Sequence, residues 1–74
     1  MEIFGQKIVV LGAGESGVGA ALLAKKIGFE VFVSDAGSIA EAAKLELTTN
    51  SIVWEEKGHS MDKILRADTI VKSP

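Results

Sequence analysis

The sequence predicts a single α/β domain built around a parallel sheet. Apolar runs typical of strands alternate with runs of helical spacing along the 74 residues, in the order βαβαβαβ. A glycine-rich segment joins the first strand to the first helix, and an aspartate closes the second strand. Strands and helices that alternate in this way form parallel sheets with right-handed crossovers.

The first half of the chain supplies two strands and a helix. Residues 7–11, KIVVL, form a short β-branched run typical of a strand that is covered on both faces. Residues 15–28 have helical spacing, and Gly28 lies where a helix C-cap is expected. The apolar positions of this helix are Val18, Leu22, Leu23 and Ile27. Residues 29–35, FEVFVSD, alternate in polarity and predict the second strand.

The second half repeats the alternation with shorter elements. Residues 38–50 predict a helix, because Ser38 and Glu41 have the spacing of a capping box. Residues 51–55, SIVWE, predict the third strand. Ser60 is expected to cap a short helix, and residues 68–74 to form the fourth strand. The predicted buried stripe of the short helix is Met61, Ile64 and Leu65.

These elements predict a Rossmann-like domain over residues 1–74, with three layers in the order α/β/α and a parallel sheet of four strands in the spatial order 3-2-1-4. The fourth strand would be an edge, with Thr69, Ile70 and Val71 unshielded. An exposed edge invites pairing with another chain, so we expect self-association there. Since the sheet ends early for this fold, we also expect the chain to be the N-terminal fragment of a longer protein.

Composition and charge exclude several classes of function. The net charge is −2 with no basic stripe, which argues against nucleic acid as a partner. No apolar run approaches the roughly 18–20 residues of a membrane span, and the N-terminus does not resemble a signal peptide. With no cysteine and one histidine, we expect neither disulfides nor a metal site, and a cytoplasmic location.

The glycine-rich turn is the strongest candidate for a binding site. Gly12, Gly14 and Gly17 fit the pattern G-x-G-x-x-G between a strand and a helix. The first glycine permits a tight turn, the second lets a diphosphate approach the backbone, and the third lets the helix pack close to the sheet. Amides and the dipole at the helix start then favour an anion. Asp35 follows at about the 20-residue spacing of an acid that accepts bonds from ribose hydroxyls.

A purely structural interpretation of these residues stays open. The glycines could serve only close packing, and Asp35 could be a solvated acid in a turn. Ser16 could donate to a phosphate or cap the helix, whereas the Glu15 carboxylate would repel an anion although it suits the helix dipole.

Four other polar or aromatic residues are interpreted as structural. We expect His59 to have a surface or capping role, Trp54 to pack half-buried, and Glu55 and Glu56 to form a solvated strand end. No catalytic residue is predicted, because no nucleophile or carboxylate pattern accompanies the histidine.

A family resemblance rests on the stretch KIVVLGAGESGVGAALLAKKIGFEVFVSD, on WEEKGH and on the closing ADTIVKSP. Together they resemble the N-terminal domain of the MurD-type ligases, which add D-glutamate to UDP-MurNAc-L-alanine in peptidoglycan synthesis. The resemblance implies three domains, the first of which holds the UDP part of that substrate. It also implies a central domain that binds ATP and Mg²⁺, and an amide bond formed through an acyl phosphate.

The resemblance further implies which residues surround the ligand. Gly14, Glu15, Ser16 and Gly17 would surround the diphosphate and uridine, together with Gly12 in the turn. Asp35 and Ala36 would meet the uracil, and Ser73 and Pro74 would close the other side of the pocket. The sequence departs from the family's pattern in having small residues after Asp35, and it lacks both the fifth strand and a G-x-x-x-x-G-K-[ST] pattern for ATP. We therefore expect no cofactor in this chain and no catalysis by it alone.

Two other functions fit the same turn. An NAD(H)-binding module of an oxidoreductase or regulatory protein would use the same glycines and Asp35. A non-binding fragment that associates through its edge strand is the third alternative.

Overall fold

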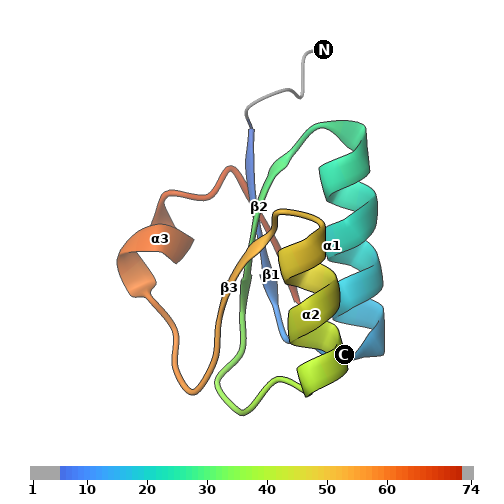
Figure 1. Ribbon diagram of the computed structural model, residues 1–74. Helices are drawn as coiled ribbons and strands as arrows, with labels where there is room; N and C mark the ends of the chain where they lie inside the picture. The colour runs from blue at the N-terminus through green and yellow to red at the C-terminus, as the bar shows by residue number, and fades with distance from the viewer. Residues whose placement is uncertain (1–5, 73–74) are drawn as a thin grey trace.

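Four parallel strands form one sheet in a computed structural model that describes residues 6–72. The strands are β1 (Lys7–Leu11), β2 (Glu30–Ser34), β3 (Val53–Glu55) and β4 (Thr69–Lys72). Their order is β3-β2-β1-β4, and the predicted topology is therefore confirmed (Figure 1). The carboxyl ends of all four strands lie at the same edge of the sheet, where loops meet in Rossmann-like domains.

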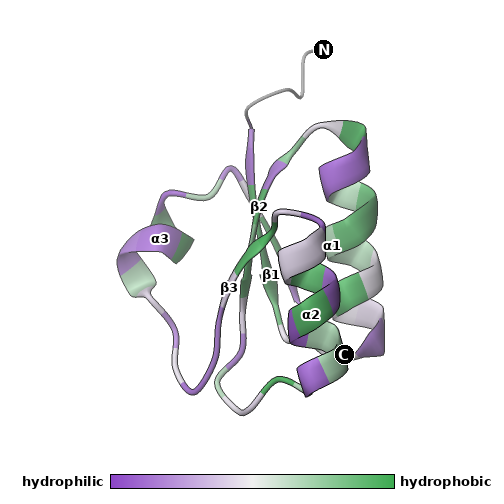
Figure 2. Cartoon of the chain, viewed as in Figure 1, coloured by the Kyte–Doolittle hydropathy of each residue, from purple (hydrophilic) through white to green (hydrophobic). Residues whose placement is uncertain are grey.

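Helices cover both faces, as the three-layer prediction requires. Helices α1 (Glu15–Ile27) and α2 (Glu41–Thr49) lie on one face of the sheet, and α3 (Met61–Leu65) lies on the other (Figure 1). The main core lies between the sheet and the first two helices, where the apolar residues gather (Figure 2). Its central members, all with no exposed surface, are Val10, Ala21, Val33 and Leu47.

Helix α1 ends as predicted but buries a narrower stripe. Gly28 has φ 121° and its N–H donates to the carbonyls of Ala24 and Lys25, so a left-handed C-cap terminates the helix. Leu23 and Ile27 remain 60% and 45% exposed, contrary to the prediction of a shared apolar face. The buried face carries small side chains such as Ala21 and Ala24, which let α1 lie close to the sheet.

Helix α2 begins later than predicted. Ala40 is the N-cap and Ser38 is exposed outside the helix, so the predicted capping box does not form. The reason is a longer-range contact: the Ile39 N–H donates to Glu56 Oε1 at 2.9 Å, which holds the chain extended before the helix. Ile39 is nevertheless buried in the core with Leu47, as its spacing suggested.

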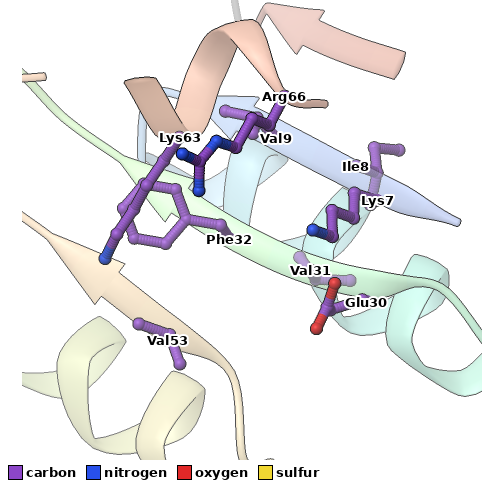
Figure 3. A pocket seen from close by; sticks show the side chains of 9 residues that line it. All are labelled: Lys7, Ile8, Val9, Glu30, Val31, Phe32, Val53, Lys63 and Arg66. Atoms are coloured by element: carbon purple, nitrogen blue, oxygen red, sulfur yellow. The ribbon is translucent and has the colours of Figure 1, made fainter. Parts of the chain in front are cut away.

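Helix α3 is short, and its predicted apolar stripe is wrong in two of three positions. Ile64 is buried, but Met61 and Leu65 are 58% and 76% exposed. The helical spacing that places these three residues on one face is present, but of the three only Ile64 is buried in the five-residue helix. Beside it lies a hollow of about 260 Å³ whose floor includes Val9, Phe32 and Val53 (Figure 3).

Candidate functional site

The glycine turn lies where β1 passes into α1, and two of its glycines have different roles. Gly12 has φ 100°, a conformation that favours glycine, and its N–H donates to the Ser34 carbonyl at 2.8 Å. The turn is thereby fixed to the end of β2. The first helical bond runs from Val18 N–H to Gly14 O at 2.9 Å, so the helix itself cannot satisfy the amides of its first turn.

Gly14 is the N-cap of α1, a position where glycine is common but not required. Its φ of −74° and ψ of −174° are open to any residue. A Cβ added to Gly14 would meet no atom within 4 Å. Neither backbone strain nor packing therefore explains this glycine, whereas Gly17 is buried against the sheet side of α1. The structural interpretation accounts for Gly12 and Gly17 but not for Gly14.

Asp35 is tied to the glycine turn. Its Oδ2 accepts a hydrogen bond from Ala13 N–H at 2.8 Å, and its Oδ1 accepts one from Gly37 N–H at 2.8 Å. These bonds, the one from Ala13 first, hold the pKa of the Asp35 carboxyl below its ordinary value of 3.8 despite partial burial. The bond from Gly37 is the one expected of an acid in a turn, and the bond from Ala13 adds a contact with the glycine turn, so an ionised carboxylate lies beside that turn.

The loop that follows β2 (residues 35–40) is held by the loop that follows β3 (residues 56–60). Lys57 N–H donates to Gly37 O at 2.8 Å, and Gly58 N–H donates to Asp35 O at 3.3 Å. Lys57 and Gly58 both have positive φ, which turns the second loop back toward the first. Glu56 adds an ion pair with Lys44 at 3.0 Å. The loop after β3 therefore holds the end of β2 in place.

Four polar side chains meet between the ends of β2 and β3, and the sequence did not predict this cluster although it singled out three of its members for other roles. Ser34 has no exposed surface, and its Oγ lies 2.8 Å from Glu55 Oε2 and 2.5 Å from His59 Nδ1. Glu55 also accepts bonds from the backbone N–H and the hydroxyl of Ser60, at 2.6 and 2.7 Å. Burial raises the pKa of Glu55, but the bonds from Ser60 and Ser34 and the charge of Lys63 outweigh it and lower that pKa below 4.5.

The prediction that Glu55 and Glu56 form a solvated strand end is therefore wrong. A usable signal was present, because Ser34 and Glu55 are paired residues of β2 and β3 and put two polar groups at one sheet end. Trp54, in contrast, is half-buried against the core as predicted, and its indole N–H donates to Thr48.

Three further predicted site residues, Glu15, Ser16 and Ala36, follow the carboxyl ends of β1 and β2. A hollow of about 350 Å³ opens between α1 and α2, and Ala13, Gly14 and Glu15 lie on its α1 side. Glu15, Ser16 and Ala36 are exposed. Ser73 and Pro74 lie outside the described residues.

The hollow beside α3 is a separate feature. Lys7 and Glu30, which begin β1 and β2, line it with Lys63 of α3 and with Arg66, the C-cap of that helix (Figure 3). Since the glycine turn follows the other end of β1, this hollow is remote from the candidate site, and no residue predicted for that site lines it.

Residues 6–72 contain neither a membrane-spanning helix nor a cluster of metal-ligating side chains. In this part of the chain, no helix is long and apolar enough to cross a membrane. Nor do these residues bring three or more His, Cys, Asp or Glu side chains together in a group that could hold a metal ion.

Comparison with known proteins gives one family and a consistent set of relatives. Residues 7–74 match the model of the MurD N-terminal domain. The chain is 58% identical over 69 residues to the UDP-N-acetylmuramoylalanine–D-glutamate ligase of Cytophaga hutchinsonii, and 60% identical over 67 residues to that of Porphyromonas gingivalis. The corresponding ligase of Chlorobium chlorochromatii is 42% identical over all 74 residues. These matches cover 90–100% of the chain but only 15–16% of each relative.

Solved structures agree on the fold. A bacillithiol disulfide reductase from Bacillus cereus matches with a TM-score of 0.69 and 22% identity, over 93% of this chain and 28% of that one. A transhydrogenase from Sinorhizobium meliloti matches with a TM-score of 0.62 and 21% identity, over 90% of this chain and 21% of that one. At such identities the likeness concerns the Rossmann-type fold alone.

Proposed function

The chain belongs to the MurD N-terminal domain family, and from this membership we propose that it binds the UDP part of UDP-MurNAc-L-alanine. The observation that carries the proposal is Gly14. It has an ordinary backbone conformation and open space where a side chain would be, at the start of a helix. Space kept free in this way suits the close approach of a diphosphate to backbone amides.

Electrostatics support an anion at this position. The N-terminus of α1 carries a partial positive charge from the helix dipole, and the helix is 13 residues long. Glu15 opposes an anion, but it is exposed and can direct its carboxylate into solvent. We therefore propose that the diphosphate contacts the backbone around Gly12, Gly14, Ser16 and Gly17.

Asp35 and Ala36 are proposed for the nucleoside end. Each oxygen of the Asp35 carboxylate accepts one amide bond, so each keeps capacity for a donor from the ligand. Ala36 is exposed beside it and offers backbone rather than side-chain contacts. Ser73 and Pro74, outside the described residues, are proposed to close the pocket as the resemblance implies.

In the whole protein we propose a cytoplasmic ligase that adds D-glutamate to UDP-MurNAc-L-alanine in an ATP-dependent reaction. This chain would hold and orient the substrate by its nucleotide. Its sequence has no G-x-x-x-x-G-K-[ST] pattern, so ATP and Mg²⁺ are proposed to bind in the part of the relatives that it does not match. We propose that this chain alone does not catalyse the reaction.

A titration followed by amide chemical shifts tests the binding proposal. UDP and UDP-MurNAc-L-alanine should shift the amides of Gly14–Gly17, whereas NADH should not. Shifts at these amides with NADH alone would favour the dinucleotide alternative and contradict the proposal. No shift with any ligand would favour the non-binding alternative.

A further inference from the structure

Ser34, His59 and Glu55 are the residue types of a hydrolytic triad, but their geometry excludes that chemistry. Ser34 has no exposed surface, so no substrate can reach its hydroxyl. Its Oγ lies between the other two groups, 2.5 Å from His59 Nδ1 and 2.8 Å from Glu55 Oε2. In a triad the imidazole lies between hydroxyl and carboxylate. Here the hydroxyl lies between the imidazole and the carboxylate, so the cluster has a role other than hydrolysis.

The protons of this cluster can be assigned from the acid. Glu55 is ionised at neutral pH, since its pKa lies below 4.5 and it already accepts two bonds from Ser60. A carboxylate can only accept, so the single hydroxyl proton of Ser34 is donated to Glu55. The Ser34 oxygen then accepts from His59, and Nδ1 must carry the hydrogen. The bonds run in one direction, from the imidazole through the hydroxyl to the carboxylate.

This chain of bonds joins the two loops beside the candidate site. His59 belongs to the loop after β3, and Ser34 is the last residue of β2, directly before Asp35. Asp35 in turn accepts the Ala13 amide of the glycine turn at 2.8 Å. Loss of the His59 bond would therefore remove one of the contacts that hold Ser34, next to the residue that anchors the turn, while the bonds of Ser34 with Gly12 and Glu55 remain.

We propose that His59 is a positioning residue of the nucleotide site. Its Nδ1–H holds Ser34, and thereby fixes Asp35 and the Ala13 amide in the arrangement that the ligand meets. This inference rests on the proposed function, because it names a residue that prepares the UDP site without touching the ligand. His59 is itself exposed, so its replacement leaves no cavity.

Two substitutions at His59 distinguish the effect of losing the hydrogen-bond donor from the effect of losing the rest of the side chain. In His59→Asn, the side-chain amide nitrogen can take the place of Nδ1 and donate to Ser34, whereas His59→Leu has no donor. Without the donor, UDP should bind about five- to tenfold more weakly to the His59→Leu variant, the effect expected for the loss of one part-buried hydrogen bond of about 1 kcal/mol. The amides of Ala13 and Gly37 should also exchange faster with solvent. The His59→Asn variant should match the wild type within about twofold.

A control variant lowers the stability of the fold without changing Ser34, Glu55, His59 or Ser60. Ile64→Val shortens a buried side chain of α3 and should leave UDP affinity unchanged while lowering the free energy of unfolding. An equal loss of affinity in Ile64→Val and His59→Leu would overturn the inference. So would equal losses in His59→Leu and His59→Asn, or wild-type affinity in both.

Failure of the proposed function would be visible separately. If the wild type does not bind UDP at all, the binding proposal is wrong, and amide exchange alone decides the inference. Unchanged exchange at Ala13 and Gly37 in His59→Leu would then overturn it, whereas faster exchange that His59→Asn restores would support it.

Discussion

Glycines of one turn satisfy different requirements. Gly12 is fixed by its backbone, since φ 100° strains any other residue. Gly14 is fixed by neither backbone nor packing, and it is therefore the residue at which folding and binding can be separated.

Replacement of Gly14 should remove binding and leave folding intact. We expect Gly14→Val to change the free energy of unfolding by less than about 1 kcal/mol, because the position is exposed and its backbone is ordinary. UDP affinity should fall by about tenfold or more, since a clash of about 1.4 kcal/mol suffices for that factor. Urea unfolding and an NMR titration measure the two quantities.

Gly19→Ala is the matched control for Gly14→Val. A Cβ at Gly19 also meets nothing within 4 Å, but the residue lies one turn further along α1. Helix propensity predicts a gain of up to about 1 kcal/mol in stability with unchanged affinity. Equal losses of UDP affinity in Gly14→Val and Gly19→Ala would indicate that the ligand binds in the hollow between α1 and α2.

Asp35 should contribute to stability in a pH-dependent way. Its pKa is lowered in the folded state by bonds from Ala13 and Gly37, so its contribution is fully present above its unfolded pKa near 3.8. The contribution is lost as the pH falls through the lower, folded-state value. Asp35→Asn should therefore lose less stability than the wild type between pH 5 and pH 2, as measured by urea unfolding. Parallel pH profiles would show that the two amide bonds are not formed.

At the scale of elements, sequence reasoning succeeded where local pattern decides the outcome. The first strand followed from a continuous apolar run, the second from alternating polarity, and the end of α1 from Gly28. It failed where a distant contact overrides a local signal. The predicted capping box of Ser38 does not form, and the Ile39 N–H binds Glu56 instead. The sequence did not predict this bond, because a contact between residues 17 positions apart leaves no local pattern.

Helix α3 offers a direct test of its corrected burial. Ile64→Ala should cost about 2–4 kcal/mol of stability, because the side chain is 7% exposed. Leu65→Ala should cost less than about 0.5 kcal/mol, since that side chain is 76% exposed. Urea unfolding of the two variants distinguishes this arrangement from the predicted three-residue stripe, which requires similar losses at both positions.

At the scale of the whole molecule, topology brings together three segments of the described chain: the glycine turn, the end of β2 with its loop, and the end of β3 with its loop. The sequence predicted the glycine turn and Asp35, because both follow a strand directly in an α/β pattern. It did not predict the polar cluster of Ser34, Glu55, His59 and Ser60. The predicted strand order brings the ends of β2 and β3 together, but the conformation of the loop after β3 completes that cluster, and adjacent residues do not encode that conformation.

The edge strand predicts concentration-dependent association. Within residues 6–72, β4 is an edge of the sheet and its Ile70 is 48% exposed. We expect sedimentation velocity to show larger species as the concentration of this chain approaches the millimolar range. Ile70→Lys should suppress them, because a charge on an edge strand opposes pairing. A wild-type chain that remains monomeric throughout would contradict this expectation.

The two amide bonds to Asp35 have a calorimetric consequence. A carboxylate already immobilised by Ala13 and Gly37 has little rotational freedom left to lose when a ligand arrives. The entropic cost of ordering that side chain is met during folding. A nucleotide should therefore bind with a smaller entropy penalty than it would at a site whose carboxylate becomes ordered only on binding.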